Sequence, residues 1–152
     1  MLKIGDKAPN FSLLSDRGAT VKLSDFKGSL LVLYFYPKAD TPGCTIEAHG
    51  FRDAQKQLEK LEAKVAGVSA DAPEKLANFR DKYQLNFPLL SDPAHQAIEA
   101  YGVWQEKNLY GKKSMGIVRT TYVIDPAGRI KAVFPRVKVA GHTEQVLAAL
   151  KV

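Results

Sequence analysis

The chain has 152 residues and a formal net charge of +6 at pH 7, and its apolar (45%) and charged (25%) fractions are typical of a globular protein, so we expect one domain over residues 1–152. Its single cysteine, Cys44, excludes an internal disulfide and the paired cysteines of structural zinc sites, and it favours a reducing, cytoplasmic location. Since no apolar run has the length of a signal peptide or of a membrane span, we expect neither secretion nor membrane insertion.

A hairpin and a buried strand are the first predicted elements. Residues 11–14 and 20–23 are short apolar stretches on either side of the turn-like sequence Asp16-Arg17-Gly18. Residues 30–36 are continuously apolar, which indicates a strand covered on both faces at the centre of an α/β sheet. Pro37 ends that strand.

A helix is predicted directly after this strand. Thr41 suits the N-cap position and Pro42 the first helical position, which places Cys44 in the first turn. Helical spacing gives this helix a buried stripe of Phe51, Ala54, Leu58 and Leu61.

The remaining elements complete an alternating pattern. In chain order they are a strand over 65–69, a helix starting near Pro73 with Leu76, Phe79 and Tyr83 inside, an apolar stretch over 87–90, a helix over 93–101, a hairpin of strands 120–124 and 130–134, and a last helix over 142–150 that buries Val146, Leu147 and Leu150. This order predicts a thioredoxin-like α/β fold, with a mixed central sheet, helices on both faces and an N-terminal β-hairpin. Ligands of such sheets bind at the carboxyl ends of the parallel strands, and Cys44 follows one of those ends.

The positive charge is concentrated between residues 104 and 139, where eight lysines and arginines accompany only two acidic residues. A basic surface can attract nucleic acid. However, these charges alternate with strand-like residues, without a basic helix or an aromatic platform. We therefore expect a solvated basic face and no nucleic-acid binding.

Cys44 is placed for chemistry more than for packing. The thiolate is the nucleophile, and an unperturbed thiol with a pKa of about 8.5 is only a few per cent ionised at pH 7. A helix dipole contributes roughly 0.3–1 kcal/mol, which is under one pKa unit, whereas a nearby cation can lower a pKa by ~1–3 units. The chemistry therefore requires a lysine or arginine beside Cys44. The hydroxyl of Thr41 can cap the helix and can also bond to the sulfur or to an incoming oxygen.

At this point the sequence resembles a known family. The segments that carry the resemblance are residues 34–37, Thr41-Pro42-Gly43-Cys44-Thr45 with Glu47, and residues 5–11, 67–69, 87–92, 106–112 and 116–121. They are similar to the peroxiredoxins, and specifically to the bacterioferritin comigratory protein, or peroxiredoxin Q, branch. The resemblance covers nearly the whole chain, and the spacing of Pro37, Thr41 and Cys44 is its most specific part.

The resemblance implies a function and a set of catalytic residues. Arg119 matches the active-site arginine of the family, and it supplies the required cation. Pro37 would shield the sulfur from water. Cys44 would reduce hydrogen peroxide and organic hydroperoxides to water or alcohols through a sulfenic acid, with Thr41, Arg119 and the Cys44 backbone N–H holding the peroxide. No metal and no other cofactor is expected.

One departure from the family concerns the resolving cysteine. Many relatives carry it five residues after the first cysteine, where this chain has His49, and others carry it in the next helix, where this chain has Arg80. Without a second cysteine, an external thiol has to reduce the sulfenic acid. That reductant can be thioredoxin, glutaredoxin or a small thiol such as glutathione, and the expected state is a monomer. On a helix, His49 points away from Cys44, so we expect no catalytic role for it.

Two alternatives belong to other functional classes. A non-enzymatic binding or chaperone module on the same fold would leave Cys44 incidental. A disulfide oxidoreductase is disfavoured because the chain has no Cys-x-x-Cys pair. Three further residues stay outside the predicted catalytic set: Glu47 can simply organise the helix surface, and Trp104 and Tyr110 can line a pocket or pack in the core.

Overall fold

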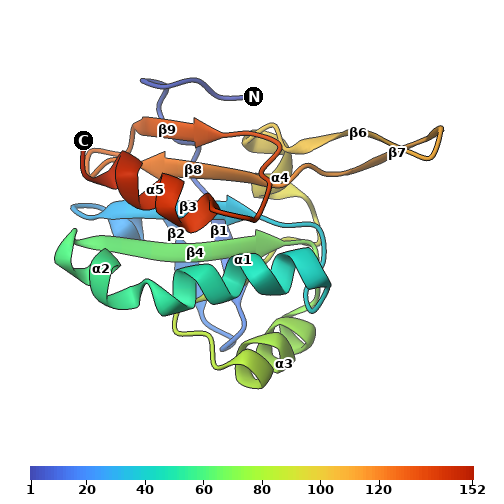
Figure 1. Cartoon of the computed structure of the whole chain (residues 1–152), viewed down its shortest axis with the longest axis horizontal. Helices are drawn as coiled ribbons and strands as arrows, with labels where there is room; N and C mark the ends of the chain where they lie inside the picture. The colour runs from blue at the N-terminus through green and yellow to red at the C-terminus, as the bar shows by residue number, and fades with distance from the viewer.

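The structure is a computed structural model that describes the backbone of residues 1–152 and every side chain except that of Leu109. A mixed seven-stranded sheet forms its centre, in the order β2-β1-β5-β4-β3-β8-β9 (Figure 1). The strands of this sheet are β1 (Ser12–Ser15), β2 (Thr20–Lys22), β3 (Leu30–Phe35), β4 (Ala63–Ser69), β5 (Leu89–Ser91), β8 (Thr120–Ile124) and β9 (Ile130–Phe134). The helices are the 3-10 helix η1 (Leu23–Phe26) and the α-helices α1 (Pro42–Asp53), α2 (Gln55–Lys60), α3 (Pro73–Tyr83), α4 (Gln96–Ala100) and α5 (His142–Leu150).

The apolar strand β3 lies at the centre of the sheet, as predicted. It pairs in parallel with β4 and antiparallel with β8, so its neighbours satisfy both edges of its backbone. Side chains from Leu31 to Tyr36 are all buried, which explains why this segment has no alternation of polar and apolar residues. The predicted mixed sheet and both predicted hairpins, β1–β2 and β8–β9, are confirmed.

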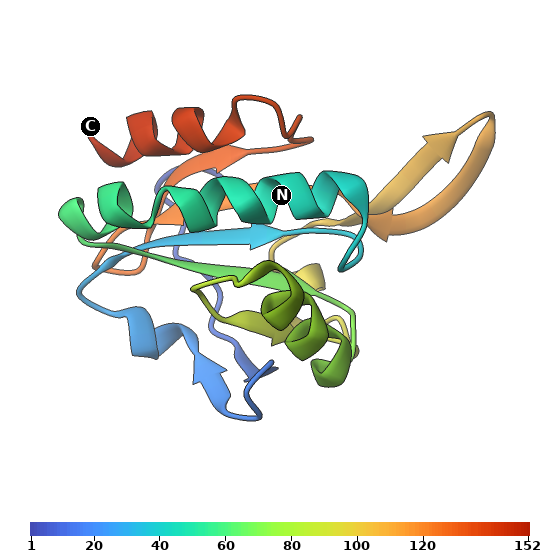
Figure 2. The ribbon, with the colours of Figure 1, turned by 60° about the horizontal axis from the view of Figure 1, so that its bottom comes forward.

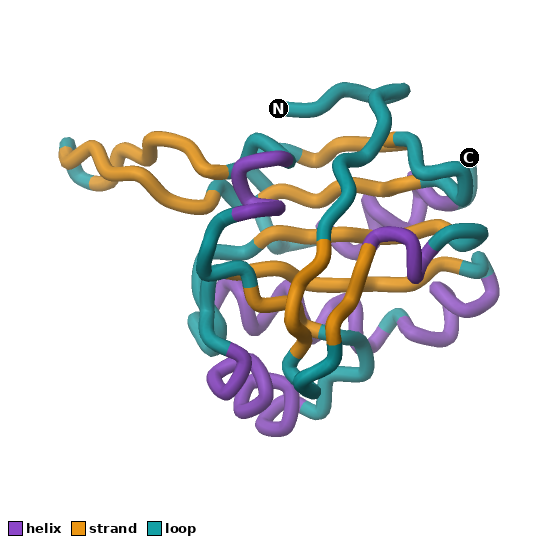
Figure 3. Tube along the Cα trace, turned by 180° about the vertical axis from the view of Figure 1, so that it is seen from behind, coloured by secondary structure: helices purple, strands orange, loops and turns teal.

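Helices cover both faces of the sheet, which confirms the predicted thioredoxin-like layout. Figure 2 shows α1 and α5 side by side over one face, and their apolar residues share a buried cluster with those of α2 and α3. The opposite face is covered by α4 and the N-terminal segment, which are in front in Figure 3 and contribute to a second cluster. No helix in the part of the chain that the structure describes is long and apolar enough to cross a membrane.

Two predicted helices have different limits from those expected. The helix after β3 is interrupted at Ala54, although Phe51, Ala54 and Leu58 are buried as predicted. The helix predicted over 93–101 begins only at Gln96, because His95 has a φ of 58° and so cannot continue a right-handed helix. The Asp92 carboxylate accepts hydrogen bonds from the backbone N–H groups of Gln96 (2.8 Å) and Ile98 (2.9 Å), and it thereby fixes the later start.

One element was not predicted from the sequence. Strands β6 (Trp104–Leu109) and β7 (Lys112–Ile117) form a separate antiparallel hairpin that projects from the body of the protein (Figure 1). Its turn is Tyr110-Gly111, and both residues have positive φ, 53° and 80°. Two consecutive positive φ values are typical of a tight two-residue hairpin turn. We call this hairpin the β6–β7 arm.

Candidate active site

Cys44 lies in the first turn of α1, just past the carboxyl end of β3. Hydrogen bonds to two neighbouring segments hold the loop between β3 and α1 in place. The backbone N–H of Ala39 donates to the Asp71 carboxylate at 2.8 Å, and Asp40 accepts hydrogen bonds from Tyr83 (2.6 Å) and Lys82 (2.9 Å) of α3. The start of α1 is therefore held against the loop after β4 and against α3.

The Cys44 sulfur is buried and contacts the guanidinium of Arg119. Cys44 is 1% exposed and belongs to the apolar cluster beneath α1. Nη2 of Arg119 donates to Cys44 Sγ at 3.4 Å. A methyl group at Gly43 would come within 3.0 Å of that same nitrogen, so the glycine leaves the space in which the guanidinium lies. The structure thus brings together the two residues that the sequence analysis paired.

Arg119 is held from both its backbone and its side chain. It lies between β7 and β8, and its carbonyl accepts a hydrogen bond from the Val137 N–H at 2.9 Å. Its Nη1 donates to Glu47 Oε1 at 2.9 Å, and its side chain is 17% exposed. Burial lowers the pKa of Arg119, but the negative charges of Glu47 and Cys44 outweigh burial and hold that pKa above its usual value. The guanidinium is therefore a permanent charge in a fixed place.

Glu47 is a member of the site that the sequence analysis left out. It was expected on the helix surface, but its side chain is 1% exposed and faces Arg119. Burial raises the pKa of Glu47 to about 7, although the charge of Arg119 and the hydrogen bond from it act in the opposite direction. The available signal was the spacing: a residue three positions after Cys44 lies on the same face of the helix.

Replacing Glu47 by glutamine is expected to change how stability depends on pH. The carboxyl group of Glu47 ionises near its usual pKa of about 4.3 when the chain unfolds, but only near pH 7 in the folded protein. Unfolding therefore releases a proton between these values, so the Glu47 contribution is fully present below about pH 4.3 and is lost as the pH rises to 7. The loss is on the order of 3 kcal/mol. Urea unfolding from pH 4.5 to 7.5 should show this decline in the wild type and a flatter curve in Glu47→Gln. Parallel curves would contradict the assignment.

His142 lies on the other side of Glu47 and is neutral there. Its Nε2 is 3.9 Å from Glu47 Oε2 and 2.8 Å from the Thr121 hydroxyl, and it is 2% exposed. Burial lowers the pKa of His142, the charge of Arg119 lowers it further, and the hydrogen bond to Gln145 partly offsets both. At neutral pH Glu47 therefore has one cationic partner among these groups, Arg119.

Thr41 and Pro37, the other two predicted catalytic residues, lie in the chain between β3 and Cys44. Thr41 occupies the N-cap position, as predicted, but its hydroxyl does not cap the helix; it donates to the Lys38 carbonyl at 2.8 Å. The expected hydrogen bond to the helix backbone is therefore replaced by one within the loop. Pro37 is half-buried and follows the last residues of β3.

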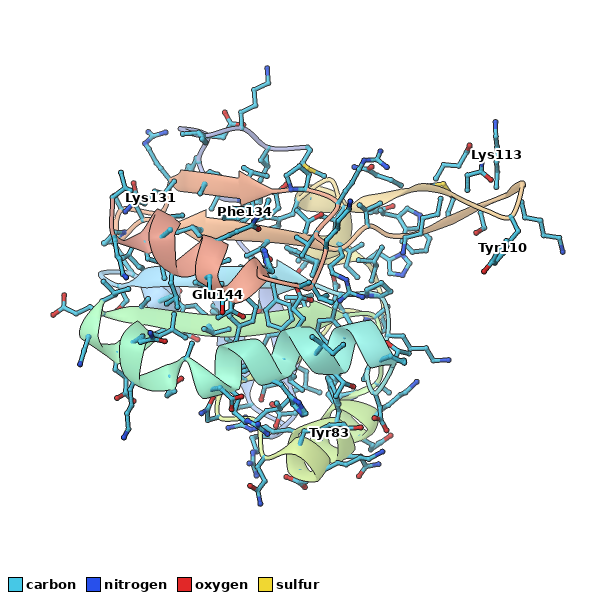
Figure 4. All side chains as sticks on the ribbon, in the orientation of Figure 1. Tyr83, Tyr110, Lys113, Lys131, Phe134 and Glu144 are labelled. Atoms are coloured by element: carbon cyan, nitrogen blue, oxygen red, sulfur yellow. The ribbon has the colours of Figure 1, made fainter. Side chains whose placement is uncertain are left out.

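The two positions where relatives carry a second cysteine have other structural roles here. His49 packs its ring against Tyr83 of α3, with ring centres 5.1 Å apart, on the side of α1 that faces α3. Arg80 forms an ion pair with the buried Asp16 at 3.2 Å. Of the two aromatic residues left open, Trp104 is half-buried against His95 and Tyr110 is fully exposed at the tip of the arm (Figure 4).

A metal site is not evident. Among the described residues there is no group of three or more histidine, cysteine, aspartate or glutamate side chains that could hold a metal ion.

Comparison with known proteins agrees with this geometry. The AhpC/TSA family matches residues 4–133. The chain is 50% identical over 149 residues to a putative peroxiredoxin bcp of Coxiella burnetii, which covers 98% of this chain and 99% of that relative. It is 48% identical over 150 residues to peroxiredoxin Bcp of Bacillus subtilis, covering 99% of this chain and 96% of the relative.

Solved structures give the same result. A cysteine-to-serine mutant of Xylella fastidiosa PrxQ superposes with a TM-score of 0.94 at 38% identity, covering 99% of this chain and 96% of that one. The bacterioferritin comigratory protein of Xanthomonas campestris, described for alkyl peroxide reduction, has a TM-score of 0.89 at 41% identity, covering 93% and 90% of the two chains.

The fold and its cysteine–arginine pair therefore define a thioredoxin-like peroxiredoxin, and the chain belongs to the AhpC/TSA family. Within it, the chain falls in the bacterioferritin comigratory protein, or peroxiredoxin Q, branch, and it has a single cysteine.

Proposed function

We propose that the protein is a thiol-dependent peroxidase in which Cys44 is the peroxide-reducing nucleophile. The observation that carries this proposal is the 3.4 Å contact between Arg119 Nη2 and Cys44 Sγ in the first turn of α1. A guanidinium and a helix N-terminus both stabilise an anionic sulfur. Membership of a peroxiredoxin family supports catalysis over a binding or chaperone module with an incidental cysteine.

The proposed reaction assigns one role to each of these groups. The Cys44 thiolate attacks the terminal oxygen of the peroxide, a sulfur–oxygen bond forms and the oxygen–oxygen bond breaks. The attacked oxygen keeps its hydrogen as a Cys44 sulfenic acid, and the other oxygen leaves as hydroxide or alkoxide and takes a proton. Negative charge moves from sulfur to the leaving oxygen, and Arg119 is placed to stabilise it. Thr41 is assigned the second donor to the peroxide, and Pro37 the shielding of the sulfur.

Glu47 is assigned the positioning of Arg119. Its Oε1 accepts from Nη1, so that Nη2 is free to face the sulfur. The substrates are hydrogen peroxide and organic hydroperoxides; the Xanthomonas campestris relative, described for alkyl peroxide reduction, supports the second class.

An external thiol completes the cycle, because the chain has no second cysteine. Thioredoxin, glutaredoxin and small thiols are the candidate reductants. We also propose that residues 1–152 form one domain, since both apolar clusters pack on the same sheet. A monomeric state and a cytoplasmic location stay predictions from the sequence.

Mass spectrometry of the reduced protein tests the proposed function. After one equivalent of peroxide, the peptide that contains Cys44 should gain one oxygen atom, and a thiol should remove it. Met1 and Met115 are exposed and can also gain oxygen, so the modified residue has to be located by peptide mapping. Oxygen on the methionines with none on Cys44 would refute the proposal.

A further inference from the structure

A basic hollow lies against the outer side of Arg119. It has a volume of about 500 Å³ and is lined by residues 106–108 of β6, by Val118 and Arg119, and by Arg136 and Val137 after β9. Three cations line it: Lys107, Arg119 and Arg136. Arg119 thus joins the hollow to the site, because this residue lines the hollow and its guanidinium contacts the Cys44 sulfur.

The Lys107 side chain lies along the arm and is not free in solvent. A methyl group at Gly116, on the paired strand β7, would come within 3.2 Å of Lys107 Cδ and 3.8 Å of its Nζ. The glycine therefore leaves a channel in which the lysine lies. Burial lowers the pKa of Lys107, the positive charge of Arg119 lowers it further, and the charge of Cys44 opposes both. Lys107 and Arg119 line the same hollow, and the charges of Arg119 and Cys44 act on Lys107 in opposite directions.

The positive charge of this hollow is not balanced by the protein. None of the ion pairs among the described side chains includes Lys107 or Arg136. Glu106 also lines the hollow, but its carboxylate is exposed and lies 3.9 Å from Lys113. Glu47 offsets Arg119 alone, from the buried side. Like charges gathered around a hollow favour an anion as its ligand.

We propose that Lys107 and Arg136 bind the carboxylate of a small thiol that reduces oxidised Cys44. This inference rests on the proposed function, since only a single-cysteine peroxidase needs such a thiol. The thiolate attacks the Cys44 sulfenic sulfur, a disulfide bond forms, and the sulfur–oxygen bond breaks to release hydroxide, which takes a proton. A second molecule of the thiol then releases Cys44 as a thiolate and leaves with the first as a disulfide.

Two thiols that differ in charge test this site. Mercaptopropionate carries a carboxylate, whereas mercaptoethanol is neutral. Cys44 is first oxidised with hydrogen peroxide, and the rate constant for its reduction is then measured with each thiol. In Lys107→Gln and in Arg136→Gln, the rate constant with mercaptopropionate should fall about 5–10-fold relative to wild type, because one charge–charge attraction near the surface is lost. The rate constant with mercaptoethanol should change less than about twofold. For each thiol, the rate constant of the variant is divided by that of the wild type, so the difference in intrinsic reactivity between the two thiols cancels.

Lys112→Gln is the matched control, because Lys112 is an exposed lysine of the same arm that does not line the hollow and forms none of the ion pairs among the described side chains. It removes the same charge outside the hollow and should leave both rate constants unchanged. An equal loss with both thiols in Lys107→Gln, or the selective loss in Lys112→Gln as well, would overturn the proposal. The rate constant for oxidation of Cys44 by a peroxide that carries a carboxylate is measured in the same variants. If Lys107→Gln and Arg136→Gln lower that rate constant and leave the reduction by mercaptopropionate unchanged, the hollow binds the peroxide, and its assignment to the thiol is wrong. Failure of wild-type Cys44 to be oxidised at all would instead refute the proposed function.

Discussion

Cys44→Ser is expected to consume no peroxide above the background rate. The reduced wild type should consume one equivalent of peroxide without added thiol, and continuous turnover should begin when a thiol is present. Serine preserves the size and hydrogen-bonding capacity of the side chain, but its hydroxyl is not ionised at neutral pH, so the nucleophile is lost. The rest of the sequence has no other thiol that can replace it. The measurement is peroxide loss against protein concentration, in a stopped-flow or electrode assay.

The thermal unfolding midpoint of Cys44→Ser is the control for this variant. Cys44 is buried beside Arg119, and a serine oxygen can accept the hydrogen bond that the sulfur now accepts, so the fold should be retained. Peroxide consumption that persists in a folded Cys44→Ser protein would remove the proposed nucleophile and return the non-enzymatic module to consideration.

The central strands of the sheet could be predicted from the sequence because they are apolar segments bounded by clear turn residues. The apolar run before Pro37 and the turn at Asp125 predicted β3 and the β8–β9 hairpin, and both are present. The β6–β7 arm was not predicted, because a two-stranded hairpin outside the sheet buries few side chains. Its sequence therefore has no apolar face that would indicate a strand. Its turn residue Tyr110 is also an uncommon choice for positive φ.

The candidate site was predictable only in part. The requirement for a cation beside Cys44 follows from the chemistry of thiols, but its identity as Arg119 came from family resemblance and not from spacing. Glu47 was missed because its spacing from Cys44 indicates the shared helix face but does not show that a glutamate on that face is buried. The hydroxyl of Thr41 donates to the Lys38 carbonyl and does not cap the helix; both kinds of partner are close in the sequence, so the sequence alone does not distinguish them.

Arg119→Ala is expected to slow oxidation of Cys44 by about 10²–10³-fold, the usual effect of removing one preorganised donor to developing negative charge. Both the thiolate and the leaving oxygen lose their cationic neighbour. Arg119→Lys keeps the charge but cannot contact Glu47 and the sulfur through two nitrogens of one rigid group, so an intermediate rate is expected. Single-turnover stopped-flow measurements with hydrogen peroxide give both rate constants. A rate for Arg119→Ala within about threefold of wild type would contradict the assigned role.

Stability and catalysis have to be separated in this variant, because Arg119 is also the partner of a buried carboxyl group. Removing one partner of a buried ion pair costs about 3–5 kcal/mol when the other stays charged, although Glu47, with a pKa of about 7, can reduce that cost by taking up a proton. The double variant Arg119→Ala/Glu47→Gln removes the unpaired carboxyl and should recover most of the lost stability. Its oxidation rate should stay as low as that of Arg119→Ala, because the cation beside the sulfur is still absent. If the double variant regained the rate together with the stability, Arg119 would serve the fold and not the chemistry at Cys44.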